Sequence, residues 1–554
     1  MTDIRRTLLW VVFGMSMLLL WDAWNKHQGH PSLFSPPAPR PAASAGAAPG
    51  GNALPGASPS LGGAAAVAPA AAASAPVASE QVTITTDLFK ATLDSQGGTL
   101  VRLELLKQID ADDATKHVVL FERRPDHLYL AQSGLVGASG LPTHLSPMTV
   151  TAGERELKDG QATLDVRFEA QAANGVKLAK TYTFRRGSYL IDVKHEVTNG
   201  GAAPLQPQLY VQLLHDGTQR GGGGGFFSGP QSFQGPALYT EANKFHKVDF
   251  KDIEKNKAEH DKSADNGWVA MLQHYYASAW LHNQKAPREF YTRKVDTNEY
   301  AVGMLFTLGS IAPGATQTFD TPLYAGPQEE RTLAATAEGL DLVRDYGIFT
   351  VLAKPMFWLL EQMHKLIGNW GWAIVALVVL LKAAFFWLNA SAYRSMAKMK
   401  AINPRVMEMR ERLKDKPQQM QQEMMRIYRE EKVNPFGSCL PILVQIPFFI
   451  ALYSVLLSSV EMRNAPWVGW ITDLSAKDPY YILPIVMTAS TLLQTWLNPT
   501  PPDPVQARMM WIMPLVFSVM FFLFPAGLVL YWVTNNLLSI AQQWVINKRL
   551  GVTK

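Results

Sequence analysis

Five long apolar runs in the C-terminal third constrain the fold of this chain more than any other feature. A helix of 18 residues is about 27 Å long, close to the hydrocarbon thickness of a bilayer. Charged residues make up 18% of the chain, below the roughly 25% typical of soluble proteins, and the shortfall is concentrated after residue 368. The runs predict an α-helical polytopic membrane protein with spans at residues 371–388, 435–457, 480–497, 509–524 and 528–545.

A sixth apolar segment lies at the N-terminus, within residues 1–30. Arg5 and Arg6 precede it, and basic residues ahead of an apolar core keep the N-terminus in the cytoplasm. The core is short enough for a cleaved signal peptide, but no small-x-small cleavage site follows directly, which favours an uncleaved anchor. Residues 31–80 are mostly Ala, Pro, Gly and Ser and predict a disordered linker.

Residues 81–326 alternate between apolar and polar positions, as in Leu164, Val166 and Phe168. A period of two is typical of half-buried antiparallel strands, so this segment predicts an all-β sandwich domain. His195 shares a strand face with aliphatic residues, which favours a core histidine over a catalytic one.

Several kinds of catalytic site lack support in the sequence. The glycine run at residues 221–225 is not followed by Gly-Lys-Ser/Thr, so a flexible loop is favoured over a phosphate-binding loop. No HExxH, GxSxG or Walker motif occurs. We therefore expect no enzyme, no catalytic residue, no metal site and no cofactor. The single cysteine, Cys439, excludes an intrachain disulfide.

Residues 327–369 connect the β domain to the membrane region. A helix is predicted to begin at Pro355 and to end at Gly368. Its polar positions include Glu361, His364 and Lys365, a pattern that fits a helix lying in the membrane interface. A short connecting helix is the alternative.

The distribution of basic residues predicts the orientation. Residues 391–434 carry eleven Lys and Arg against six Asp and Glu, and the tail at 547–554 is also basic. By the positive-inside rule, both segments and the N-terminus are cytoplasmic and the β domain lies on the far side.

The cytoplasmic segment 391–434 predicts a helical hairpin that breaks near Lys416 and Pro417. Methionine-rich surfaces can receive varied apolar segments, although packing of one helix on the other is the favoured interpretation. The methionines in question are Met399, Met409, Met420 and Met424.

Lys382 lies inside the first of the five runs. A charge at the bilayer centre costs about 2.5–3.5 kcal/mol on insertion scales, and such residues usually face a wet cavity or a partner. Its long side chain could instead reach the headgroups. Since the five runs contain no acidic residue, and since Gln445, Ser454 and Asn535 offer polar groups, a water-filled cationic cavity open to the cytoplasm is favoured.

Five segments of the C-terminal region resemble motifs of the YidC/Oxa family of bacterial membrane insertases. They are 368–371 (Gly-Asn-Trp-Gly), 395–399 (Ser-Met-Ala-Lys-Met), 431–435 (Glu-Lys-Val-Asn-Pro), 478–484 (Asp-Pro-Tyr-Tyr-Ile-Leu-Pro) and 524–531 (Phe-Pro-Ala-Gly-Leu-Val-Leu-Tyr). The resemblance covers this region almost without gaps, and the N-terminal anchor and large outer domain are similar to the Gram-negative form.

The resemblance implies a periplasmic β-supersandwich domain and a five-helix core in the inner membrane. The core would enclose a hydrophilic groove that is open to the cytoplasm and the bilayer. The family's groove arginine falls at Lys382. The charge is kept, but the five-donor guanidinium fork is lost, which puts any mechanism that needs bidentate geometry in doubt.

The implied mechanism holds the polar or acidic tail of a nascent membrane protein in the groove while its apolar segment slides into lipid. The contacts predicted for the sliding segment are Ile442, Ile446, Phe449, Leu515, Phe517, Met520, Tyr531 and Trp532. The implied partners are nascent membrane proteins, the Sec translocon, the ribosome, the signal-recognition receptor and the lipid bilayer, without sequence-specific binding of nucleic acid.

Two other functions remain open from the sequence. Five spans around a charged cavity also suit a solute transporter or channel, although no inverted repeat is visible. The β domain also resembles aldose epimerases in its expected architecture, so a membrane-anchored carbohydrate-modifying enzyme is the second alternative. Solute flux in liposomes would favour the first, and an essential role for residues 81–325 alone would favour the second.

Overall fold

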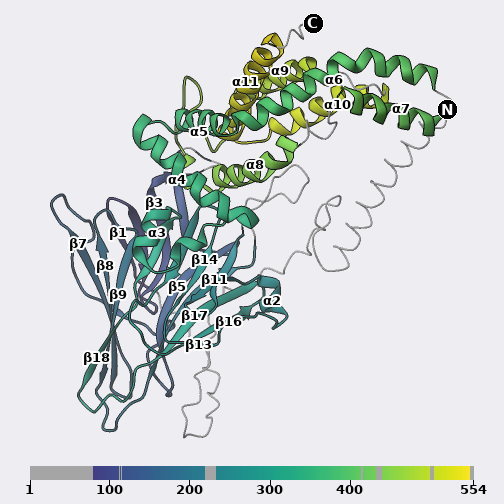
Figure 1. Cartoon of the computed structure of the whole chain (residues 1–554). Helices are drawn as coiled ribbons and strands as arrows, with labels where there is room; N and C mark the ends of the chain where they lie inside the picture. Colours follow the sequence, from purple (N-terminus) through teal and green to yellow (C-terminus); the bar gives the residue numbers. More distant parts are fainter. Residues whose placement is uncertain are drawn as a thin grey trace. The chain divides into compact units, whose positions relative to one another are not determined.

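The computed structural model describes residues 79–110, 113, 115–218, 233–413, 416–431, 440–498 and 504–549. These residues belong to two compact units, which meet in the sequence between Arg344 and Asp345 (Figure 1). Several predicted features lie outside the described residues: the anchor (1–30), nearly all of the linker (31–80), the glycine run (221–225), Cys439 and the end of the tail (550–554).

The first unit consists of two antiparallel sheets, which confirms the predicted β-sandwich. One sheet has nine strands, in the order β1 (Gln81–Thr85), β2 (Phe89–Asp94), β3 (Thr99–Ile109), β4 (His117–Arg124), β5 (His127–Val136), β10 (Gln208–Asp216), β17 (Glu299–Thr307), β16 (Arg288–Asp296) and β13 (Ser263–Ala264). The other has ten, in the order β12 (Lys244–Lys247), β11 (Gly235–Thr240), β14 (Trp268–Leu272), β15 (Tyr276–Trp280), β19 (Leu323–Pro327), β9 (Leu190–Asn199), β8 (Val176–Arg185), β7 (Thr163–Gln171) and β6 (Thr149–Val150), with β18 (Thr316–Asp320) beside β9.

The alternation in the sequence corresponds to the side chains that fill the core. Leu164, Val166 and Phe168 on β7 are all buried, while the residues between them are more accessible. The main apolar cluster also contains Leu103 and Val211 from the nine-stranded sheet. Because apolar residues of both sheets share one cluster, the two sheets pack face to face.

His195 is fully buried on β9, as predicted for a core histidine. Its Nε2 lies 2.9 Å from Ser133 Oγ. Burial, and secondarily the charge of Lys180, lowers the pKa of His195 to about 3. Lys180 is itself fully buried and donates to the carbonyls of Gly97 and Ser133, at 2.6 and 2.7 Å.

Three short helical elements complete the first unit: α2 (Phe250–Glu254), α3 (Glu330–Thr336) and the 3-10 turn η1 (Leu340–Val343). Leu333, Leu340 and Val343 pack on aromatic side chains of the ten-stranded sheet, including Tyr239. Gly339 joins α3 to η1 with φ +71°, and a Cβ atom there would lie 2.3 Å from Tyr239 Cε2. The turn therefore requires glycine for both its backbone angle and its close approach.

The second unit is helical. Its described elements are η2 (Gly347–Phe349), α4 (Thr350–Ile367), α5 (Trp370–Ala384), α6 (Phe386–Arg412), α7 (Pro417–Glu430), α8 (Leu440–Ser458), η3 (Val460–Met462), α9 (Ile482–Leu497), α10 (Pro504–Phe521) and α11 (Ala526–Arg549). Apolar residues of α4, α5, α8, α9, α10 and α11 share a single core cluster. A helical C-terminal region is thus confirmed.

The predicted helix start at Pro355 is wrong. Helix α4 begins at Thr350 rather than Pro355, because the 3-10 turn η2 leads directly into it and the Thr350 hydroxyl donates to the Gly347 carbonyl. Helix α11 begins at Ala526, two residues before the predicted run, because the carbonyls of Ala476 and Leu474 accept its first amide protons. The predicted end of α4 at Gly368 is confirmed, with φ +75°.

The predicted single helix at 371–388 is also wrong: α5 and α6 meet at Phe385 with a bend of 68°. Phe385 packs edge-on against Phe448 of α8, with ring centroids 5.1 Å apart. On the other side, Gln542 of α11 donates to the Phe386 carbonyl. These contacts join residues far apart in the sequence, so the local pattern does not reveal the bend.

Within the described ranges, no single helix is both long and apolar enough to cross a membrane. The bent pair formed by α5 and the first part of α6 satisfies this test when its two helices are taken together. Three shorter apolar helices cover Val444–Ser458, Ile482–Leu497 and Ala507–Phe521. The count of six spans stays a prediction.

Helices α6 and α7 form the predicted hairpin. Val406 and Met409 of α6 are buried against Ile427 of α7, and Met420 and Met424 are partly buried in the same cluster. Met409, Met420 and Met424 therefore pack one helix on the other, as the favoured interpretation expects. Met399 is half-buried outside this cluster.

Candidate functional site

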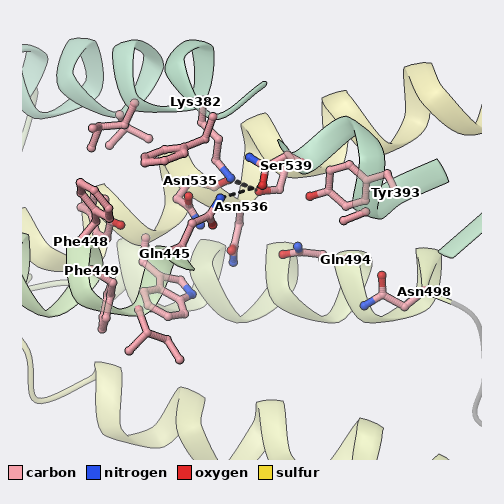
Figure 2. A pocket seen from close by; sticks show the side chains of 18 of the residues that line it. Lys382, Tyr393, Gln445, Phe448, Phe449, Gln494, Asn498, Asn535, Asn536 and Ser539 are labelled. Atoms are coloured by element: carbon pink, nitrogen blue, oxygen red, sulfur yellow. Dashed lines mark hydrogen bonds between the residues drawn. The ribbon is translucent and has the colours of Figure 1, made fainter. Parts of the chain in front are cut away.

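The helical unit encloses a cavity of about 350 Å³ between α5, α6, α8, α9 and α11 (Figure 2). Its lining combines one cation with amide, hydroxyl, aromatic and aliphatic side chains. The lining residues are Val378, Leu381, Lys382, Phe385, Asn389, Ala392, Tyr393, Met396, Gln445, Ile446, Phe448, Phe449, Gln494, Asn498, Tyr531, Trp532, Asn535, Asn536 and Ser539.

Lys382 lies in the last turn of α5 and extends into this cavity. Its Nζ donates to Ser539 Oγ of α11, at 2.7 Å (Figure 2). The side chain is therefore hydrogen-bonded inside the helical unit. That the cavity is filled with water and open to the cytoplasm stays a prediction. The lining includes no carboxylate in the part of the chain that the structure describes.

Gln445 and Asn535 line the cavity as predicted, whereas Ser454 does not. Gln445 Nε2 donates to Asn389 Oδ1 at 2.7 Å, which ties α8 to α6. Ser454 lies nine residues beyond Gln445, which is two and a half helical turns, and so it occupies the opposite face of α8. Its carbonyl accepts a hydrogen bond from Ser458 Oγ.

The predicted sliding contacts divide into two groups. Ile446, Phe449, Tyr531 and Trp532 line the cavity. The Phe449 ring centroid lies 5.8 Å from that of Tyr531 and 4.8 Å from that of Trp532, so these three rings form one aromatic wall.

The contacts predicted on α10 lie outside the cavity lining. Leu515 and Phe517 are 48% and 51% exposed, and Met520 is partly buried. The side chain of Ile442, in the first turn of α8, lies outside the described residues.

Sequence reasoning missed most of the polar lining: Asn389, Tyr393, Gln494, Asn498, Asn536 and Ser539. A usable signal exists on α11, where Asn535, Ser539 and Gln543 recur every four residues within an apolar run. This spacing places polar groups on one helix face. Asn536 Nδ2 in turn donates to Ser490 Oγ and Thr491 Oγ1 of α9, at 3.2 and 2.9 Å.

The cavity can bind hydrogen-bond acceptors and negative charge. An ammonium group has three donors, and one of those on Lys382 is used by Ser539. Asn389 is 5% exposed, and its Nδ2 has no hydrogen-bond partner within the described part of the chain. No group of three metal-ligating side chains occurs among the described residues.

Comparison with known proteins assigns the family. The YidC periplasmic domain family matches residues 81–359, and the 60 kDa inner membrane protein family matches residues 362–553. A relative from Cupriavidus necator named membrane protein insertase YidC is 56% identical over 556 residues, covering 100% of this chain and 99% of its own. One of the same name from Ralstonia nicotianae is 53% identical over 561 residues, again covering 100% and 99%.

A crystal structure described as an active YidC insertase with its first transmembrane domain resolved aligns with 84% of this chain and 92% of its own. The identity is 19% and the TM-score is 0.39, so the assignment rests on the full-length relatives instead. With both family matches and these identities, the chain belongs to the YidC family of bacterial inner-membrane insertases.

Proposed function

We propose that this chain inserts nascent proteins into the bacterial inner membrane, and that the cavity around Lys382 holds the polar or acidic part of the substrate during insertion. The relatives' name supports the activity. The single observation that carries the role of the cavity is the position of Lys382, whose ammonium lies among amides and hydroxyls without a carboxylate in the described lining.

Capture in this cavity is electrostatic and reversible. A carboxylate that enters meets a cation in surroundings of low dielectric constant, where attraction is stronger than in water. Amide groups such as those of Asn389 and Gln445 supply further hydrogen bonds to a backbone that is not yet helical. No covalent step is needed, and we assign no catalytic residue.

Release is driven by transfer of the substrate's apolar segment to lipid. Ile446 on α8 is 42% exposed, and Leu515 and Phe517 on α10 are about half exposed. These side chains offer apolar surface along which a segment can move toward the bilayer. Burial of apolar area stabilises by about 25 cal/mol per Å², so a typical span outweighs the loss of a few polar contacts in the cavity.

The proposed topology places both termini and the α6–α7 hairpin in the cytoplasm, and the β unit in the periplasm. The excess of basic residues between 391 and 434 supports this orientation. Helix α4, with Trp358 and Leu366 exposed at 57% and 80%, is proposed to lie in the membrane interface. The Sec translocon, the ribosome and the signal-recognition receptor remain proposed partners.

Substitution of Lys382 tests the role of the cavity. With a short substrate that has an acidic tail, insertion into liposomes should survive Lys382→Arg and fall in Lys382→Ala and Lys382→Glu. The same substrate with its acidic residues changed to amides should be less affected. Full activity of Lys382→Glu on the acidic tail would reject electrostatic capture.

The same liposomes distinguish insertion from transport of solutes. An insertase should place a one-span substrate across the bilayer, as read by protease protection, without releasing a trapped small solute. Solute release without insertion would instead support the channel alternative.

A further inference from the structure

We propose that Ser539 is a positioning residue that holds the Lys382 ammonium inside the cavity, so that substrates with acidic tails meet a preoriented charge. This inference rests on the proposed function of the cavity. It concerns a residue of α11 that the sequence reasoning did not single out.

The hydrogen bonds of Ser539 orient its hydroxyl toward the lysine. Ser539 is 3% exposed, and its Oγ donates to the Asn535 carbonyl one turn earlier in α11, at 2.7 Å. A hydroxyl has one proton and two lone pairs. Because the proton is used within α11, the oxygen acts as an acceptor, and Lys382 Nζ donates to it at 2.7 Å. The side chain of Tyr393 is a further hydrogen-bond partner of Ser539.

The lysine needs such a partner because its side chain is long and flexible. A lysine near the end of an apolar helix can extend to the headgroups, and Lys382 is two residues from the end of α5. The bond to Ser539 links α5 to α11 across the cavity, and Figure 2 shows the two side chains pointing toward one another beside Asn535 and Asn536. This hydrogen bond therefore favours the conformation in which the Lys382 side chain points into the cavity.

The bond also leaves the charge available. Ser539 occupies one of the three ammonium donors, so the other two can bind a carboxylate or carbonyl oxygen of the substrate. A serine contributes no charge of its own, so the attraction for an acidic tail is not neutralised, as it would be by a carboxylate partner.

The test uses full-length protein in liposomes and two matched substrates, one with an acidic tail and one in which those residues are amides. The variants are Ser539→Ala, Ser539→Thr, Lys382→Ala and the double variant Ser539→Ala/Lys382→Ala. Ser518→Ala is the control. Its hydroxyl is also buried and also donates to a carbonyl four residues earlier, but it lies on α10 outside the cavity lining.

The readout is the ratio of acidic-tail to amide-tail insertion. Loss of one hydrogen bond to a charged group should lower this ratio in Ser539→Ala by about tenfold or more. Ser539→Thr keeps the hydroxyl, so its insertion ratio should be close to that of the unsubstituted protein. The control Ser518→Ala should leave the insertion ratio unchanged. In the Lys382→Ala background, Ser539→Ala should change the ratio no further, since there is no ammonium left to position.

Four results would overturn the inference. An equal fall for both tails in Ser539→Ala would indicate a merely structural hydroxyl. A further fall of the ratio in the double variant would show that Ser539 acts independently of the lysine. If Lys382→Ala lowers the ratio and Ser539→Ala does not, positioning is rejected while the proposed function stands; if Lys382→Ala leaves the ratio unchanged, the proposed function fails and this inference fails with it.

Discussion

Gln445 Nε2 donates to Asn389 Oδ1 at 2.7 Å, and this amide pair fixes the direction in which α6 leaves the bend at Phe385. One turn further along α8, Phe448 packs against Phe385 itself. Two successive turns of α8 therefore contact Asn389, in the first turn of α6, and Phe385, at the bend, and all four residues line the cavity.

Removal of one member of this pair should cost more than removal of both. Gln445→Leu leaves both arms of the buried Asn389 amide without a partner, which should destabilise the helical unit by about 1–3 kcal/mol. The double variant Gln445→Leu/Asn389→Leu removes the polar groups together and should recover part of that loss. Thermal unfolding in detergent measures these two variants and Asn389→Leu. A loss in the double variant equal to the sum of the two single losses would contradict the proposed coupling.

Oxidation of the hairpin should follow the exposure of its methionines rather than their spacing in the sequence. Met407 and Met425 are 54% and 47% exposed, whereas Met409 is 4% exposed. Peroxide should convert the first two to sulfoxide well before Met409, as followed by peptide mass spectrometry. Equal rates at Met409 and Met425 would mean that α6 and α7 separate readily in solution.

The sequence predicted those parts of the fold that depend on local patterns. Alternation along β7 and β9 reflects the two faces of a strand, so burial of Val166 and His195 followed from it. The end of α4 at Gly368 depends on a backbone angle that glycine adopts easily. The family resemblance was equally local, since it rests on short motifs.

The features that sequence reasoning missed depend on contacts between distant residues. The bend at Phe385 needs α8 and α11 beside it. Ser454 is rotated by half a turn from Gln445 about the axis of α8, at 100° per residue, so helix geometry places the two side chains on opposite faces. Ser539 could have been found from the four-residue spacing of polar groups on α11.

Asp478 should contribute strongly to the stability of the helical unit. It is 2% exposed, and its carboxylate accepts from Trp470 Nε1, Tyr480 N and Leu483 N, at 3.0, 3.0 and 2.7 Å. Asp478→Ala leaves these donors unpaired and should cost at least about 1–3 kcal/mol. Asp478→Asn keeps one acceptor oxygen, so it should lower the free energy of unfolding by less than Asp478→Ala does. Thermal unfolding in detergent measures both variants.

A neighbouring carboxylate provides the control for that comparison. Asp473 accepts from the backbone and hydroxyl of Ser475, at 2.7 Å in both cases, but it is only partly buried. Asp473→Ala should therefore have the smaller effect, and equal losses would contradict the role assigned to the burial of Asp478.

Lys180 should make the β unit more stable as the pH rises above neutrality. Burial between the sheets lowers the pKa of this lysine from 10.5 to about 7. Between these values the unfolded chain binds a proton that the folded chain does not, so stability rises with pH, by at most about 1.4 kcal/mol per pH unit. Below pH 7 Lys180 is protonated in both the folded and the unfolded chain, so it no longer makes the stability depend on pH.

Lys180→Met should abolish that slope, because methionine has a similar length and no proton to bind. The absolute stability should fall, since the carbonyls of Gly97 and Ser133 lose their donor. Pulse proteolysis of the full chain in urea at pH 7, 8 and 9, read on the fragment 79–344, measures the slope. The control Lys90→Met removes an exposed lysine of β2 and should leave the slope of stability against pH unchanged. An unchanged slope in Lys180→Met would assign the pH dependence to another group.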